Sequence, residues 1–322
     1  AADYAEPDAV PYENGGEEPS FPHRLPTEPL AAARNLIYFP WMDSLIGAFA
    51  LEGARQLGLG RRTGPDLLAV SFSTTDEVGH RYGPDSRELH DHLIRLDRWL
   101  GWFLDSLATL VPAERTVVVL TADHGVQSFP EIARQAGVRG AGRVWLGDVA
   151  ARMGSDLAAR YRLDFQLRFD RGLIAADTVA MHARGIPVDS LAATLARAAR
   201  SRPGVARVFT PATLPAAPPG DREATLWKNQ IPAGFGWLLC AANEPGYLWS
   251  SPGRTQADHG STAPADVTVP IAFLGAGIRP ARLDRPVRTV DIPPTLAALI
   301  GVRPTEALDG VVLPEIVGPR PH

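Results

Sequence analysis

The chain of 322 residues has one cysteine, Cys240, so it can form neither an intramolecular disulfide nor a cysteine-based metal finger. None of its apolar runs approaches the about 20 residues that a membrane-spanning helix needs. With 32 basic and 36 acidic residues, its formal net charge of -4 gives no strong field for nucleic acid or an anionic membrane. These absences favour a small-molecule partner, and they leave histidine and carboxylate side chains as the ligands of any metal.

The apolar content of 45% is enough for a core, and the length predicts two domains or one large α/β domain with an insertion. Three short apolar runs predict strands that are buried on both faces. A helix is predicted over 41–57, a second one starts at a capping box formed by Asp85 and Glu88, and a third covers 290–302. The three predicted strands are "DLLAVSF" (66–72), "RTVVVLTADHG" (115–125) and "VPIAFLGAG" (269–277). This alternation predicts an α/β fold with a mostly parallel sheet sandwiched by helices.

Composition divides the chain into three parts. Residues 1–30 are acidic and rich in proline and glycine, which predicts a linker or loop that continues from a missing amino-terminal segment. Residues 31–150 and 256–318 contain the predicted α/β core. Between them, 151–255 predict a small α+β insertion: "YRLDFQLRFD" alternates like a half-exposed antiparallel strand, and it is followed by a helix over "DSLAATLARAAR" and a strand over "VARVFT".

Three histidines stand beside glycine or aspartate in predicted loops: His80 in "DEVGH", His124 in "TADHGV" and His259 in "QADHGST". Catalytic zinc is typically held by histidine and carboxylate ligands with one position left open. Taken singly, each motif is more often a surface pair or a turn. The first two follow predicted strands, where ligands of α/β sheets bind, so together the motifs predict a metal site. No role in that site is expected for His90 and His92.

The motifs "SFSTTDEVGHRYGPDS", "LTADHGV", "DHGST", "VPIAFLGAGI" and "VRTVDIPPTLAALIGV" resemble the alkaline phosphatase superfamily. The resemblance is to the branch that holds the PafA-type alkaline phosphatases and the type I phosphodiesterases/nucleotide pyrophosphatases, and it runs from about residue 20 to about residue 315. It implies an alkaline-phosphatase-like fold and hydrolysis of phosphoric esters by two zinc ions (Zn²⁺) about 4 Å apart.

Carried over residue by residue, the resemblance implies that Asp76, His80 and His259 bind one zinc ion. It implies that Asp123 and His124 bind the second, with Gly125 allowing the chain to turn there. The relatives' Thr or Ser nucleophile comes from an earlier segment that has no counterpart here. The chain is therefore expected to be the carboxy-terminal portion of a longer enzyme and inactive alone, with its missing amino-terminal segment as a partner.

Other residues are weaker candidates for catalysis. Thr74 and Thr75 flank a proposed ligand, which makes either a poor choice of nucleophile, and the sole lysine, Lys228, is expected on the surface. Sulfatases place their catalytic cysteine or serine in a different sequence motif from that around Cys240. Metal-dependent phosphoglycerate mutases do not usually show the "GHxxGP" motif. Both families are therefore less favoured than phosphoric ester hydrolases.

The remaining alternative is a catalytically silent metal-binding α/β protein or an inactive fragment. If the chain does belong to an enzyme, a small phosphorylated substrate is expected, either a monoester or a diester. The resemblance also implies a periplasmic or extracellular location.

Overall fold

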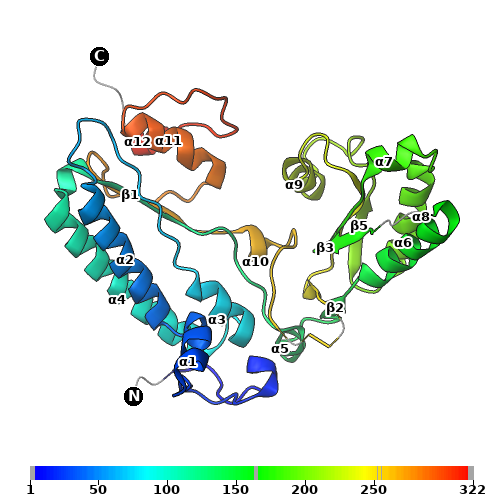
Figure 1. Ribbon diagram of the computed structural model, residues 1–322, viewed down its shortest axis with the longest axis horizontal. Helices are drawn as coiled ribbons and strands as arrows, with labels where there is room; N and C mark the ends of the chain where they lie inside the picture. Colours follow the sequence, from blue (N-terminus) through cyan, green and yellow to red (C-terminus); the bar gives the residue numbers. More distant parts are fainter. Residues whose placement is uncertain (1–3, 163–165, 252, 255, 318–322) are drawn as a thin grey trace. The chain divides into compact units, whose positions relative to one another are not determined.

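The computed structural model describes residues 4–162, 166–251, 253–254 and 256–317 (Figure 1). The chain divides into two compact units. The first, called the sheet unit, comprises the chain up to His23, Val78–Leu89 and His124–Thr268. The second, called the helical unit, comprises Arg24–Glu77, His90–Asp123 and the chain from Val269 onward. Two of the boundaries fall within helices, α3 (Thr74–Tyr82) and α4 (Arg87–Leu110), so each of these helices has residues in both units.

The helical unit contains the helices that were predicted over 41–57 and 290–302. Helix α2 lies at the predicted position, and Figure 1 shows it beside α4. A Cβ added at Gly47 of α2 would lie 3.6 Å from the Trp102 ring and 3.8 Å from the Phe103 ring of α4, so the two helices pack closely there. Apart from α3 and α4, the elements of the helical unit are α1 (Pro29–Asn35), η2 (Leu36–Tyr38), α2 (Trp41–Leu57), η3 (Ala113–Arg115), β1 (Val117–Thr121), β8 (Ile271–Gly275), η4 (Thr289–Asp291), α11 (Ile292–Leu299) and α12 (Pro314–Val317).

The start of α4 differs from the predicted capping box. The Ser86 hydroxyl oxygen accepts a hydrogen bond from the Leu89 backbone N–H at 3.2 Å, so serine, a preferred N-cap residue, takes the place predicted for Asp85. The carboxylate of Glu88 instead lies 2.7 Å from the His23 imidazole. Glu88 therefore helps to fix the amino-terminal segment rather than the helix start.

The strands of the helical unit are fewer and more exposed than predicted. β1 and β8 pair antiparallel, and Leu120 and Leu274 remain 45% and 46% exposed. Residues 66–72, predicted as a buried strand, form no strand, and Leu67 is 76% exposed. An apolar run becomes a buried strand only when neighbours pair with it and cover it. The described residues provide no such neighbour for 66–72, so that prediction is wrong for this chain.

The sheet unit contains the residues predicted as the α+β insertion. Its four-stranded antiparallel sheet has the order β3-β4-β6-β5, and β2 and β7 form a separate parallel pair. Most described ladders are thus antiparallel, which differs from the expected mostly parallel sheet. The elements are η1 (Glu13–Gly16), α5 (Pro130–Gln135), β2 (Gly142–Val144), α6 (Gly147–Tyr161), β3 (Arg168–Asp170), β4 (Leu173–Ala175), α7 (Thr178–Ala183), α8 (Val188–Arg200), β5 (Val205–Phe209), α9 (Arg222–Gln230), β6 (Trp237–Asn243), β7 (Tyr247–Trp249) and α10 (Pro264–Val267).

The core of the sheet unit lies on both faces of β6. Leu239 and Ala241 pack with α6 and α8 on one side, through residues such as Leu195. Cys240, between them in sequence, packs with Trp227 of α9 in a second cluster. Alternate residues of a strand point to opposite faces, so helices on both sides bury this strand. α8 and β5 confirm the predicted helix and strand, whereas the predicted strand over 161–170 is reduced to β3, and 163–165 lie outside the described residues.

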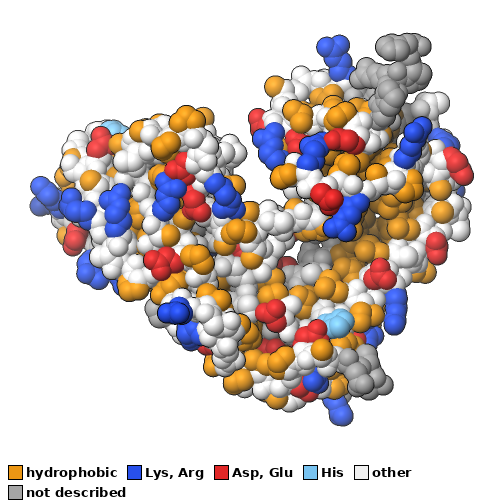
Figure 2. Space-filling view, turned by 180° about the vertical axis from the view of Figure 1, so that it is seen from behind, with side chains coloured by type: hydrophobic (Ala, Val, Ile, Leu, Met, Phe, Trp, Pro, Cys, Tyr) orange, Lys and Arg blue, Asp and Glu red, His pale blue; other side chains and the backbone are white. Residues whose placement is uncertain are grey.

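The surface agrees with the near-neutral composition. On the face drawn in Figure 2, basic and acidic side chains are interspersed rather than gathered into a field of one sign. In the part of the chain that the structure describes, no helix is both long enough and apolar enough to cross a bilayer.

Candidate metal centre

Two of the predicted ligands, Asp76 and His80, lie on α3, and not in the loop expected from the sequence. Residues four apart on a helix face the same side, so both side chains share one face of α3. The second half of α3 is anchored by Val78 and Tyr82, which are 2% and 5% exposed. A helix holds the spacing of these two groups more rigidly than a loop would.

Within the sheet unit, His80 meets the segment that carries the third predicted ligand. Potential ligand atoms of His80, Asp258 and His259 all lie within 4.8 Å of one another. Asp258 is buried, at 4% exposure, whereas the two histidines are half-buried. Asp258 was not among the predicted ligands, although it precedes His259 just as Asp123 precedes His124. Histidine nitrogens with a carboxylate form a donor set that suits zinc.

Hydrogen bonds orient two of the imidazole rings. Nδ1 of His80 lies 2.8 Å from the carbonyl oxygen of Ala257, and Nδ1 of His124 lies 2.9 Å from that of Gly125. Because a carbonyl only accepts, this geometry assigns the N–H to Nδ1 in both rings. Nε2 then keeps its lone pair, which is the arrangement found in metal-binding histidines.

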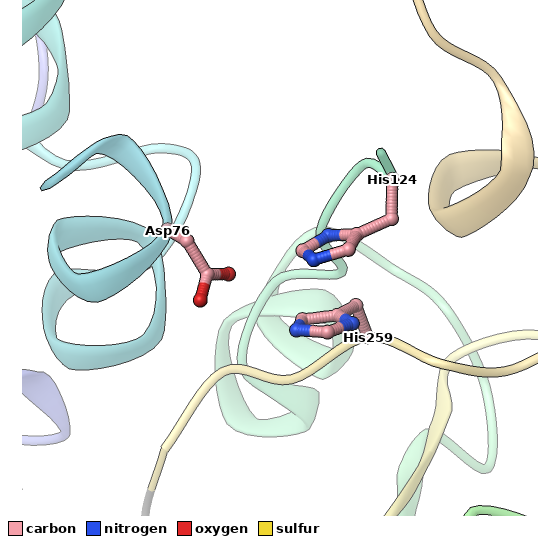
Figure 3. Close-up of side chains that lie close together, drawn as sticks. All are labelled: Asp76, His124 and His259. Carbon is pink, nitrogen blue, oxygen red and sulfur yellow. The ribbon is translucent and has the colours of Figure 1, made fainter. Parts of the chain in front are cut away.

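The segments that follow β1 and precede α10 lie against each other. The rings of His124 and His259 stack with centroids 3.4 Å apart and an interplanar angle of 13° (Figure 3). The backbone N–H of Gln127 donates to the Asp258 carbonyl at 3.0 Å. Figure 3 also draws Asp76, on the first turn of α3. Asp123 is exposed and is not one of the clustered ligands that the described residues offer.

Gly125 is needed for close approach rather than for an unusual backbone angle. A Cβ at this position would lie 2.0 Å from the carbonyl oxygen of Ala265, and the Gly125 N–H donates to the Asp266 carbonyl at 2.7 Å. The expected turn therefore has a different physical cause: any side chain at 125 would push the two segments apart.

Asp266 forms hydrogen bonds with both segments, and no motif in the sequence predicted this role. Its carboxylate Oδ2 accepts hydrogen bonds from the Ser261 backbone N–H at 2.8 Å and from Nε2 of Gln127 at 3.0 Å. The side chain is 2% exposed, and burial raises the pKa of its carboxyl above the ordinary value. Asp266 thus fixes the relation between the His124 and His259 segments without facing solvent.

The two threonines are engaged in a buried network of the helical unit. The Thr75 hydroxyl lies 2.9 Å from Nε2 of His92, and Asp43 accepts a hydrogen bond from the Thr74 backbone N–H at 3.3 Å. Asp43 also lies 3.4 Å from the same Nε2 of His92, whereas a catalytic triad needs the carboxylate on the other ring nitrogen. This arrangement does not create an activated nucleophile.

Two further side chains agree with their expected lack of a role. Lys228 is exposed at the end of α9. Cys240 is fully buried in β6, and burial raises the pKa of its thiol. A buried thiol with a raised pKa is a poor nucleophile, so the sulfatase alternative gains no support from Cys240.

Comparisons with known proteins agree with the resemblance in the motifs. The type I phosphodiesterase / nucleotide pyrophosphatase family matches residues 21–166. The alkaline phosphatase PhoD of Zymomonas mobilis is 34% identical over 77% of this chain and 44% of its own length. The alkaline phosphatase PhoK of Sphingomonas is 29% identical over 87% of this chain and 52% of its own length. The chain spans about half the length of these curated relatives.

The solved structures confirm the expected fold class. The crystal structure of wild-type alkaline phosphatase PafA superposes with a TM-score of 0.82 at 21% identity, covering 97% of this chain and 60% of that protein. The alkaline-phosphatase-like fold is therefore shown even though the described ladders are mostly antiparallel. By its motifs and its relatives, the chain is similar to the alkaline phosphatase superfamily, in the branch of the PafA-type alkaline phosphatases and type I phosphodiesterases/nucleotide pyrophosphatases, and it has the fold of PafA.

Proposed function

We propose that this chain is the metal-binding portion of a zinc-dependent phosphoric ester hydrolase. The observation that carries the proposal is the cluster of His80, Asp258 and His259, whose potential ligand atoms lie within 4.8 Å of one another. The hydrogen bond from His80 Nδ1 to the Ala257 carbonyl adds to it, because in the neutral ring the lone pair is then on Nε2, the atom that would bind a metal. The coarser assignment, a phosphoric ester hydrolase, rests on the alkaline phosphatase relatives.

Each proposed ligand has a role in one of two zinc sites. Asp76, His80 and His259 are proposed to hold the first ion, with Asp258 as a buried carboxylate beside it. Asp123 and His124 are proposed to contribute to the second. Zinc bound there would stabilise negative charge on the attacking and leaving oxygens of an in-line displacement at phosphorus. The chain's own residues would position the ions.

The nucleophile is proposed to come from outside this chain. Thr75 hydrogen-bonds a fully buried histidine, and Thr74 is only 2% exposed, so neither presents a hydroxyl to a substrate. The relatives PhoD and PhoK are about twice as long as the part of them that this chain matches. A Thr or Ser of the remaining part is proposed to attack phosphorus and to displace the alcohol of the ester, which gives a phospho-enzyme that water then hydrolyses. A periplasmic or extracellular location is proposed by the same resemblance.

The test has two stages. After dialysis against metal-free buffer, the purified 322-residue chain should retain about one zinc ion. A folded chain that retains none would contradict the proposed site. The protein made from the complete reading frame should then hydrolyse a chromogenic phosphate monoester or diester. Zinc retention without any turnover would instead support the catalytically silent alternative.

A further inference from the structure

Arg171 occupies a strained position at the tip of the β3–β4 hairpin. Asp170 pairs with Leu173, which leaves Arg171 and Gly172 as a two-residue turn. Their φ angles are +38° and +89°. Both are positive, as a type I′ turn requires at its two central residues. Asn or Gly fits the first of these positions readily, whereas an arginine there is strained. Strain of this kind is often retained where a side chain has a function.

The side chain of Arg171 reaches the proposed metal centre. Its Nη2 lies 3.5 Å from Oδ1 of Asp258, beside His80 and His259. A Cβ added to Gly260 would lie 2.0 Å from Cδ of Arg171, so the arginine stem occupies the space that a side chain at 260 would fill. The position of Arg171 therefore depends on the glycine of the second Asp-His-Gly motif.

The guanidinium of Arg171 makes only a long hydrogen bond to the carboxylate of Asp258. A separation of 3.5 Å exceeds the 2.7–2.9 Å typical of charge-assisted hydrogen bonds, and Asp258 Oδ1 already accepts from the His259 backbone N–H at 2.9 Å. The Arg171 side chain is 40% exposed. Most of its five N–H donors thus remain available to a ligand that enters beside the histidines.

Two other arginines near this segment already donate hydrogen bonds to its backbone carbonyls. Arg143 donates to the Gln256 carbonyl at 2.8 Å and to the Glu131 carboxylate at 3.0 Å. Arg222 donates to the Thr262 carbonyl at 2.8 Å. Both hold the backbone of the segment that carries Asp258 and His259. Arg171 differs from them because it contacts no backbone carbonyl in the described residues.

We propose that Arg171 binds the substrate's phosphoryl group at this site. Its guanidinium would donate to non-bridging oxygens, a contact that its planar fork can make in bidentate form. This inference rests on the proposed function, because it requires a phosphate ester at the His80–His259 centre. It assigns a substrate-binding role to the hairpin tip of the sheet unit, and it favours substrates with two negative charges on phosphorus.

The test is calorimetric titration of inorganic phosphate into the zinc-loaded chain and its Arg171→Asn variant. Asn-Gly is the preferred pair for a type I′ turn, so the variant should melt at the same temperature as the wild type or higher. Its zinc content should be unchanged. Loss of a charged hydrogen-bond donor should weaken phosphate binding about 10- to 100-fold. Arg171→Lys should recover part of that loss, and Arg168→Gln, on the exposed part of the same hairpin, should bind phosphate normally.

The outcomes separate this inference from the proposed function. A wild-type chain that holds no zinc contradicts the function itself. A wild-type chain that holds zinc but binds no phosphate overturns only the role of Arg171. A twofold or smaller change in phosphate affinity for Arg171→Asn, with zinc intact, also overturns it. Loss of zinc or a lower melting temperature in that variant would mean that Arg171 merely holds Asp258, which likewise overturns the proposal.

Discussion

The imidazole rings of His124 and His259 stack face to face, with centroids 3.4 Å apart. The ring of His259 also lies 4.8 Å from that of His80, so it is near both of the other histidines. The sequence separates His124 from His259 by more than a hundred residues. Backbone hydrogen bonds through Gln127 and Gly125 hold the two segments at this distance. A change at His259 should therefore disturb the contacts of both other histidines.

His259→Ala should remove the zinc ion that the purified chain retains, because it deletes the ring that neighbours both other histidines. In the complete enzyme, the same change should lower the rate of ester hydrolysis by several orders of magnitude. His90→Ala, on α4 and outside the cluster, should leave both zinc content and rate almost unchanged. Zinc per chain, measured by atomic emission, is the first readout. Comparable zinc losses in the two variants would refute the ligand assignment.

Gly125→Ala should lower the free energy of unfolding by about 1–3 kcal/mol, because overpacking forces the backbone to shift. The added Cβ would meet the Ala265 carbonyl oxygen at 2.0 Å. Gly101→Ala is the matched control: it lies within α4 with nothing within 4 Å of its added Cβ. That control should stabilise the protein by about 0.5–1 kcal/mol. Urea titrations of the two variants should therefore shift in opposite directions.

Local patterns located several elements well. α2 coincides with the predicted helix, α8 begins one residue before its predicted segment, and α11, β5 and β8 lie within theirs, because apolar spacing and turn residues are local properties. The run at 66–72 failed because its length and composition cannot say whether a neighbouring strand pairs with it. The loop predicted around Asp76 is a helix, whose buried Val78 and Tyr82 at four-residue spacing were the missed signal.

The candidate site was predictable only in part. Glycine beside histidine, repeated in three motifs, pointed to His80, His124 and His259. Asp266 and Arg171 gave no comparable signal, since their contacts come from distant segments that only folding brings together. Tertiary contacts of this kind have no local sequence pattern.

The buried network of Asp43 and His92 should matter for stability. Both side chains are fully buried, and they meet the start of α3 through Thr74 and Thr75. His92→Leu should lower the free energy of unfolding by about 1–3 kcal/mol, because it removes the imidazole beside the buried Oδ2 of Asp43 and the hydrogen-bond partner of the Thr75 hydroxyl. The double variant with Asp43→Leu should lose less than the sum of the single variants. Simple additivity in a denaturant double-mutant cycle would show that the two side chains do not interact.

Glu13 should make stability fall as the pH rises. Its side chain is 2% exposed, and burial, with the nearby Glu88 and Asp8 carboxylates, raises its pKa from 4.5 to about 8. Between these values the folded protein binds a proton that the unfolded chain has lost, so each pH unit removes at most about 1.4 kcal/mol of stability. Glu13→Gln stays neutral and should remove that contribution, raising the melting temperature more at pH 8 than at pH 5. The exposed control Glu17→Gln should show no such difference, and equal shifts for both variants would contradict the assignment.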